Sequence, residues 1–355
     1  MKKYLSIILL VAMLVMLTAC SSTTGQTTST TLDTAQQSTA NIETTDSTSE
    51  STKVEVASAA GSAISLAVLK GPTGFVAADW LANSPSDIYP AVSAEVLKSP
   101  DLVAPLLARG EVDLAMVPTT MAVQLYKKTE GKVKFLAVTT KGVLHLCERG
   151  DSVHDITDLR GKTILLSGAG TTPEQILRRL LEAAGLDPDQ DVNWQLLPEH
   201  AAVVQTLAQQ ADSVALLPEP FVTVAQTKLQ DLRVAVDLND AWAKYLHNAQ
   251  GESGNIVMGV LVARSEWLEA HADVVEQVLE AVQHSQQTAV TKPAEVATEI
   301  GALDIFETQI AEKAIPRSGL ASLIGEQGRQ AVEDFLIALD DEKTPVPDAD
   351  FYYLP

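Results

Sequence analysis

Short apolar runs alternate with amphipathic stretches along most of the chain after residue 60. The runs 63–69, 112–118 and 132–140 are apolar and bounded by turn residues, which predicts buried strands. The stretches 72–84 and 119–131 that lie between them have helical spacing. Strands and helices that alternate at this spacing predict a parallel sheet covered by helices on both faces.

A second series of the same kind begins near residue 155. Its clearest element is the helix expected over 172–185, whose apolar side chains fall on one face and whose arginines lie off it. After a long β-rich run at 255–264 the pattern becomes mostly helical. Two α/β series of similar size predict two lobes, with the runs 143–149 and 255–264 as strands able to cross between them.

The first residues have the shape of a secretory signal. Two lysines precede an apolar run over 4–17, which is too short for a comfortable transmembrane helix. Leu17-Thr18-Ala19-Cys20 resembles the lipobox of bacterial lipoproteins, in which cleavage precedes a cysteine that is then lipidated. We therefore expect residues 1–19 to be a lipoprotein signal peptide and Cys20 to carry lipid. An uncleaved anchor or an ordinary signal peptide stays open as an alternative.

The stretch after Cys20 is rich in Ser and Thr up to about residue 53 and has no hydrophobic period. Such a segment buries too little apolar surface to offset its ordering entropy. We expect residues 20–60 to form a disordered tether, with a reach of roughly 30–35 Å for a flexible coil of this length. The many hydroxyls leave O-glycosylation open.

Charge and cysteine usage narrow the possible partners. The chain has 25 basic and 46 acidic residues, a formal net charge of -21, which argues against a nucleic-acid partner and against electrostatic adhesion to anionic lipid.

With Cys20 lipidated, Cys147 is the remaining cysteine and no internal disulfide can form. Cys147 lies in an apolar alternation, so we expect a small buried hydrophobe rather than a catalytic thiol.

Five stretches together resemble the solute-binding lipoproteins of ABC importers, in the branch that binds nitrate, sulfonates, taurine and thiamine precursors. They are LKGPTG (69–74), LARGEVDLAMVPTTMA (107–122), ITDLRGKTILLSGAGTTPE (156–174), ALLPEPFVTVA (215–225) and MGVLVARSEWLEAHADVVEQVL (258–279). The likeness covers nearly all of the chain after the tether. It is carried by the order and spacing of the stretches, since each one alone is weak.

The resemblance implies a periplasmic-binding-protein-like fold of type II, with two doubly wound α/β lobes joined by two crossover strands. It would place lobe 1 at 61–143 plus 256–355 and lobe 2 at 144–255. The implied protein is a monomer on the extracytoplasmic face of a bacterial membrane, held there by its lipid. It would capture a small polar, anionic or heteroaromatic solute between its lobes and deliver it to the permease and ATPase subunits of the importer.

Helix N-termini supply the expected ligand contacts. Their free backbone N–H groups and partial positive charge bind polar groups without requiring Lys or Arg. In open α/β sheets such helix starts meet at the carboxyl ends of the strands. The candidate ligand-binding residues are Lys70, Gly71, Pro72, Thr73, Gly74, Pro118, Thr119, Thr120, Thr140, Ser167, Gly168, Ala169, Gly170, Thr171, Thr172, Glu219 and Trp242.

The Gly-rich turn over 167–173 raises the alternative of a nucleotide-phosphate loop. That loop requires a Lys followed by Ser or Thr after its second Gly, and this turn has none. A neutral helix start fits better, in which Thr172 is the N-cap, Gln175 completes a capping box and Pro173 takes the first helical position.

Two other functions remain open from the sequence. An exported lipoprotein enzyme on the same fold would require a nucleophile–base pair, and no stretch of the sequence displays one. A metal-binding lipoprotein would require clustered ligands, and the six histidines show no HxH or HxxxH spacing. We therefore expect no cofactor and no metal.

Overall fold

The computed structural model describes residues 51–54, 63–168, 170–246 and 255–354. The predicted signal peptide, Cys20, most of the predicted tether and Ala169 lie outside the described residues. All described residues fall in one compact unit. In this part of the chain no helix is both long and apolar enough to cross a membrane.

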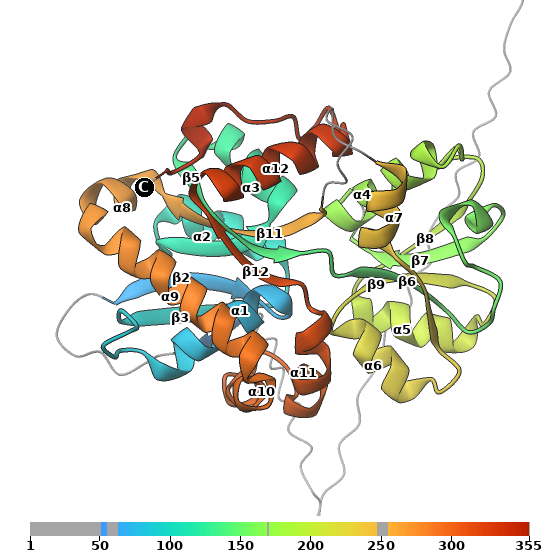
Figure 1. The fold of residues 1–355 in the computed structure, drawn as a ribbon, viewed down its shortest axis with the longest axis horizontal. Helices are drawn as coiled ribbons and strands as arrows, with labels where there is room; N and C mark the ends of the chain where they lie inside the picture. Colours follow the sequence, from blue (N-terminus) through green and yellow to red (C-terminus); the bar gives the residue numbers. More distant parts are fainter. Residues whose placement is uncertain (1–50, 55–62, 169, 247–254, 355) are drawn as a thin grey trace, which may run out of the picture. The chain divides into compact units, whose positions relative to one another are not determined.

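A seven-stranded sheet, which we call the large sheet, has the order β1-β3-β2-β4-β11-β5-β12 in the described part of the chain (Figure 1). Its strands are β1 Ser51–Val54, β2 Ile64–Leu69, β3 Val92–Leu97, β4 Leu114–Pro118, β5 Val133–Lys141, β11 Val257–Arg264 and β12 Leu320–Ile324. β2 is parallel to β3 and β4, whereas β11 is antiparallel to both β4 and β5. The predicted strand runs 63–69, 112–118 and 132–140 correspond to β2, β4 and β5, which point the same way, and β11 and β12 from the C-terminal third insert in the opposite direction.

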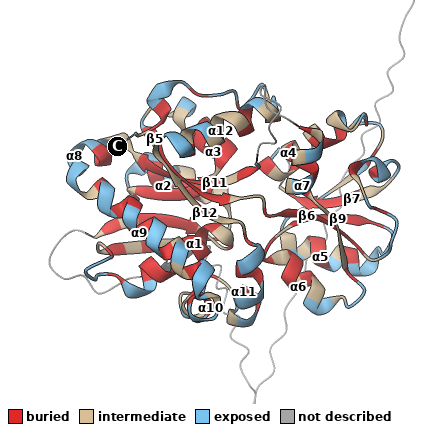
Figure 2. Cartoon of the chain, in the orientation of Figure 1, coloured by how far each residue is buried: buried red, intermediate tan, exposed pale blue. Residues whose placement is uncertain are grey.

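Helices cover the large sheet, whose strands are mostly coloured as buried in Figure 2. Leu66 and Val68 belong to the core beneath α1, α9 and α10, and Ala67 belongs to the core beneath α2, α3 and α12. The helices on the large sheet are α1 Pro72–Asn83, α2 Val103–Arg109, α3 Thr119–Lys128, α8 Ser265–Ala270, α9 Ala272–Thr291, α10 Pro293–Ala302, α11 Thr308–Ala314 and α12 Gly325–Leu339. Short 3-10 turns, η1 Pro100–Leu102, η3 Ile315–Arg317 and η4 Ala349–Phe351, supplement them.

A five-stranded sheet, the small sheet, has the order β10-β6-β9-β7-β8 among the described residues. Its strands are β6 Leu144–Glu148, β7 Thr163–Ser167, β8 Asn193–Leu197, β9 Val214–Pro218 and β10 Arg233–Asp237, and its helices are η2 Ile156–Leu159, α4 Thr172–Ala183, α5 His200–Gln209, α6 Phe221–Lys228 and α7 Leu238–Tyr245. β7 is parallel to β8 and β9, and β6 is antiparallel to β9 and β10. We call residues 144–246 the small-sheet part, and residues 63–141 with 257–354 the large-sheet part.

Strand β1 lies within the stretch that the sequence predicts as tether. It pairs antiparallel with β3, from Ser51 opposite Leu97 to Val54 opposite Ala94. The exposed edge of β3 offers unpaired backbone groups, and any chain in extended conformation can satisfy them without burying a hydrophobic face. The predicted tether therefore includes four residues, Ser51–Val54, that pair with β3.

The chain passes between the two sheets at two places, and the side chain of Asn239 lies close to both. The first is the short turn between β5 and β6, and the second joins α7 to β11 and includes residues outside the described ranges. Asn239 of α7 accepts a hydrogen bond from the Ile256 N–H at 3.2 Å. A Cβ at Gly142, in the first passage, would come within 2.6 Å of Asn239. The two passages therefore lie side by side.

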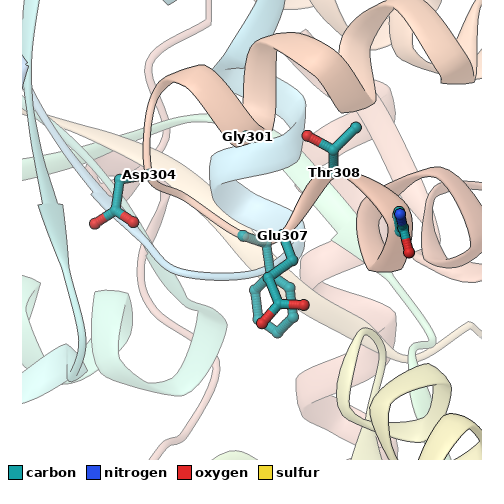
Figure 3. A pocket seen from close by; sticks show the side chains of 6 residues that line it. Gly301, Asp304, Glu307 and Thr308 are labelled. Carbon is teal, nitrogen blue, oxygen red and sulfur yellow. The ribbon is translucent and has the colours of Figure 1, made fainter.

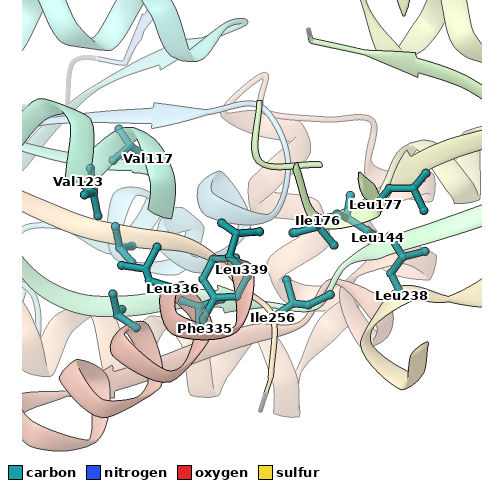
Figure 4. Close-up of a cluster of buried hydrophobic side chains, with 14 of the residues drawn as sticks. Val117, Val123, Leu144, Ile176, Leu177, Leu238, Ile256, Phe335, Leu336 and Leu339 are labelled. Atoms are coloured by element: carbon teal, nitrogen blue, oxygen red, sulfur yellow. The ribbon is translucent and has the colours of Figure 1, made fainter. Parts of the chain in front are cut away.

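One hydrophobic cluster spans both sheets (Figure 4). Phe335 and Leu339 of α12 belong to it together with Ile176 and Leu177 of α4 and Trp242 of α7. Polar contacts reinforce the same surface, because Arg179 Nε donates to the Ala338 carbonyl oxygen at 2.9 Å. α12 therefore packs on the small-sheet part as well as on its own sheet.

Candidate functional site

Two of the predicted helix starts face each other. Thr120, in the first turn of α3, and Thr172, at the start of α4, lie with their Oγ1 atoms 2.6 Å apart. Both side chains are buried, at 4% and 1% exposure, and their helices follow β4 of the large sheet and β7 of the small sheet. Neighbouring Thr119 donates through Oγ1 to the Val257 carbonyl oxygen at 2.7 Å, and Pro118 takes the N-cap position of α3. The structure therefore brings these two predicted loops together.

The start of α1 approaches the small-sheet part as well. Gly71 is the N-cap with φ 124°, a conformation that favours glycine, and no side chain caps the helix. A Cβ at Gly71 would lie 3.8 Å from Pro220 of the small-sheet part. Gly74 is packed against Ile305, where a Cβ would come within 2.8 Å. Three helix starts, those of α1, α3 and α4, thus lie where the two parts meet, with Pro72 at the first position of α1.

Threonines surround a glycine beside the start of α1. A Cβ at Gly259 of β11 would lie 2.5 Å from Thr140 Oγ1, 3.1 Å from Thr73 Cγ2 and 3.2 Å from Thr139 Oγ1. Thr139 is fully buried and its Oγ1 has no hydrogen-bond partner among the described residues. A buried hydroxyl without a partner costs free energy, which makes Thr139 a candidate for a hydrogen bond to a ligand. The sequence predicts Thr73 and Thr140 for the site and misses Thr139.

The turn before α4 differs in detail from its predicted capping. Thr171, not Thr172, is the N-cap, so that Pro173 is the second helical residue and no side-chain capping bond forms. No capping box forms, because Glu174 Oε2 accepts a hydrogen bond at 2.7 Å from the N–H of Gly170, the residue before the N-cap. Gln175 instead donates to Asp341 of the tail that follows α12. Gly168 and Gly170 both have positive φ, as a tight turn requires.

A line of rings crosses from α1 to the small sheet. Phe306 lies edge-on to Phe75 of α1 at 6.3 Å between ring centroids and to Phe221 of α6 at 5.6 Å. The Phe221 ring lies 4.8 Å from that of His200, whose Nδ1 is 2.8 Å from Ser167 Oγ. Only Ser167 of this series is predicted from the sequence. The other rings come from separate stretches, and no local pattern marks them.

Ser167 and His200 form a hydroxyl–imidazole pair, the type of nucleophile–base pair that no stretch of the sequence displays. Burial lowers the pKa of His200 to about 4. The imidazole is therefore neutral at pH 7 and a weak base. No carboxylate of the described residues hydrogen-bonds to His200, so the described contacts lack the third group that orients a catalytic base. The pair supplies hydrogen-bonding groups at the end of the line of rings.

Glu219 does not have the predicted environment of a carboxylate open to a ligand. It is fully buried, and its Oε2 accepts hydrogen bonds from the Thr223 N–H at 3.1 Å and from Thr223 Oγ1 at 2.8 Å. Its Oε1 lies 2.9 Å from Arg317 Nη2 of η3, in the geometry of an ion pair rather than of a hydrogen bond. Its acceptor capacity is directed at the protein.

Trp242 lies in the core. Its side chain has no exposed surface and packs against Phe335 of α12 at 5.5 Å between ring centroids. The sequence predicts it for the ligand site, whereas the residue lies on α7 and its ring fills the cluster shared by the two sheets. Cys147 is also fully buried, as expected, and burial raises the pKa of its thiol to about 12.

A pocket of about 480 Å³ opens beside Phe306 (Figure 3). It is lined by Gly301, Asp304, Phe306, Glu307, Thr308 and Gln309, on the connection between α10 and α11. Asp304 is ion-paired with Lys70, the predicted site residue that precedes α1, at 3.2 Å. The pocket therefore adjoins the start of α1 and shares a ring with the aromatic line. No group of three metal-ligating side chains occurs among the described residues.

Solved structures define the class to which this fold belongs. The structure of an ABC transporter protein from Parabacteroides distasonis is 27% identical with a TM-score of 0.68, and the match covers 82% of this chain and 99% of that one. The zinc-bound ligand-binding component of an ABC-type import system from Staphylococcus aureus (16% identity, TM-score 0.63, 83% and 97% coverage) has the same fold. So does the aliphatic sulphonate binding protein SsuA from Escherichia coli (14%, 0.63, 83% and 93%). The chain has the periplasmic-binding-protein fold.

The family follows from the sequence match. The family model described as NMT1/THI5 like matches residues 92–296, more than half of the chain, and the protein belongs to this family. No curated protein matches the sequence. The predicted fold class and the predicted family are therefore confirmed.

Proposed function

We propose that the protein is the extracytoplasmic solute-binding protein of an ABC importer, and that it delivers its solute to a membrane permease with an ATPase. The observation that carries the proposal is the meeting of the helix starts of α3 and α4 at the Thr120–Thr172 contact, in a chain of this family. We propose further that the parts move as lobes, 61–143 with 256–355 and 144–255, and that Cys20 anchors a monomer to the membrane.

The hydroxyls, N–H groups and rings near the helix starts of α1, α3 and α4 favour a small polar or heteroaromatic solute. Hydroxyls of Thr73, Thr140 and Thr172 and the N–H groups of the helix starts offer hydrogen bonds. The rings of Phe221 and Phe306 offer flat apolar surface. A sulfonate, nitrate, a thiamine-precursor pyrimidine and a flavin-like ring all satisfy part of this set.

A thermal-shift screen of those solute classes, followed by calorimetric titration, tests the proposal. A solute at a hundred times its dissociation constant is expected to stabilise the protein by about 2.7 kcal/mol. In Thr172→Val the hydroxyl is lost at constant shape, and we expect the affinity for that solute to fall about tenfold. Thr298→Val, at an exposed position on α10, is the matched control and should bind as the wild type does. Equal binding by both variants would place the solute elsewhere.

An enzymatic role and the membrane anchor have their own tests. Incubation with the bound solute followed by mass spectrometry should recover it unchanged, and turnover would instead favour the exported enzyme. Cys20→Ser should shift the protein from the detergent phase to the aqueous phase in phase partitioning if the cysteine carries lipid. Retention in the detergent phase would contradict the anchor.

A further inference from the structure

Arg317 connects the two parts of the protein beside the turn that joins their sheets. It ends η3, on the large-sheet part, and its Nη2 lies 2.9 Å from Glu219 Oε1, on the small-sheet part. The same nitrogen donates to Thr223 Oγ1 at 2.7 Å and to Gln226 Oε1 at 3.2 Å. One guanidinium thus contacts Thr223 and Gln226 of α6 and Glu219, which lies two residues before α6.

The Glu219 side is built to receive this cation. The carboxylate is fully buried and Thr223 is 2% exposed, and the Thr223 hydroxyl donates to Glu219 while it accepts from Arg317. The Glu219 N–H donates to the Val143 carbonyl oxygen at 3.0 Å, which ties the carboxylate to the turn between β5 and β6. A buried carboxylate that loses its cation is strongly disfavoured, so this arrangement requires Arg317 in place.

The Arg317 side is held against the same turn. The Lys141 N–H donates to the Gly319 carbonyl oxygen at 2.8 Å. A Cβ at Gly319, where φ is 56°, would lie 2.8 Å from the Gly142 carbonyl oxygen, so only glycine permits this approach. Ser318 is fully buried and donates through Oγ to the Ala314 carbonyl oxygen at 2.8 Å, which fixes the turn that presents Arg317. Both partners of the ion pair are therefore anchored to residues 141–143.

We infer that Arg317 is a hinge clamp, which favours one angle between the large-sheet and small-sheet parts in the absence of solute, through Glu219, Thr223 and Gln226. This inference rests on the proposed function in one respect, namely that the two parts move about residues 141–143. The clamp determines how much of the protein is closed before solute arrives. It is a positioning element and does not require contact with the solute.

Distances between spin labels in solute-free protein test the clamp. Labels are attached at Glu280→Cys on α9 and Gln205→Cys on α5, both exposed, in the full chain with Cys20→Ser. The remaining thiol, Cys147, is fully buried and stays unlabelled. With Arg317→Gln we expect a longer and broader distance distribution, with the ratio of closed to open molecules reduced about tenfold, because hydrogen bonds to a charged group are lost. The same distribution as in wild type overturns the inference.

Matched variants separate the clamp from a general loss of stability. Arg149→Gln breaks an ion pair with Asp231 that lies wholly within the small-sheet part, and it should leave the distances unchanged. Opening of equal size in Arg149→Gln would overturn the inference. Arg317→Lys keeps the positive charge without the fork of nitrogens, and should open the protein less than Arg317→Gln does. Because no solute is present, a failed solute screen leaves this test intact, and unchanged distances leave the solute-binding proposal intact.

Discussion

His200 should make the protein lose stability in mild acid, before most carboxylates titrate. Its pKa is lowered to about 4 by burial between Phe221 and Ser167, whereas an unfolded chain protonates its histidines near 6.5. A group whose folded pKa is depressed stabilises the protein above the unfolded pKa. That stability is lost as the pH falls from about 6.5 toward 4. The full gap corresponds to about 3 kcal/mol, and partial exposure of the residue reduces our expectation to about 2 kcal/mol.

Urea unfolding at several pH values between 7.5 and 4.5 measures this loss. His200→Gln retains a hydrogen-bonding group opposite Ser167 but cannot gain the proton. We expect wild type to lose about 2 kcal/mol more than His200→Gln over this range. The difference between the two proteins removes the contribution of carboxylates such as Glu148 and Asp155, whose pKa values are lowered and which titrate in both. Parallel pH profiles, or a directly measured His200 pKa near 6.5 by NMR, would refute the reasoning.

Three further predictions concern the buried core and the threonines around Gly259. Gly259→Ala places a methyl group 2.5 Å from Thr140 Oγ1 and should lower the free energy of unfolding by about 1–3 kcal/mol. Adding Thr140→Ala should restore part of that loss. If urea unfolding shows no loss for Gly259→Ala, the strands shift to make room for the methyl group. Trp242→Ala should cost about 3–5 kcal/mol by the same measurement, and a smaller loss would show that α12 and α7 close the cavity. Cys147 should react with a thiol reagent only after unfolding, and rapid labelling of the native protein would contradict its burial.

Periodicity predicts most of the fold because burial repeats along each element. The helix expected at 172–185 is α4, and its predicted apolar face is buried at Ile176, Leu177, Leu180 and Leu181. β12 escapes prediction because it is short and its burial comes from neighbours far away in the chain, not from its own pattern. Tertiary pairing also creates β1, in a stretch whose composition indicates disorder.

The candidate site could be predicted only where it is local. Helix starts are marked by Gly, Pro and Thr in adjacent positions, so the loops at Gly71, Thr120 and Thr172 were found, and two of them touch. The sequence marks Glu219 as a candidate but does not predict its ion pair, because its partner Arg317 lies in a different part of the chain. Which distant cation reaches a carboxylate depends on how the sheets are placed, and one sequence does not encode that in any short pattern.

The strand order has a consequence for how the chain acquires its structure during synthesis. β5 takes its neighbours from β11 and β12, and the Tyr353 N–H donates to the Phe135 carbonyl oxygen of β5. The small sheet, by contrast, is built from one continuous stretch, 144–237. Contacts between residues near in sequence form sooner. The small sheet can therefore form while the large sheet still lacks β11 and β12, which are made after the whole of the small sheet and complete the sheet that contains β2, β3 and β4.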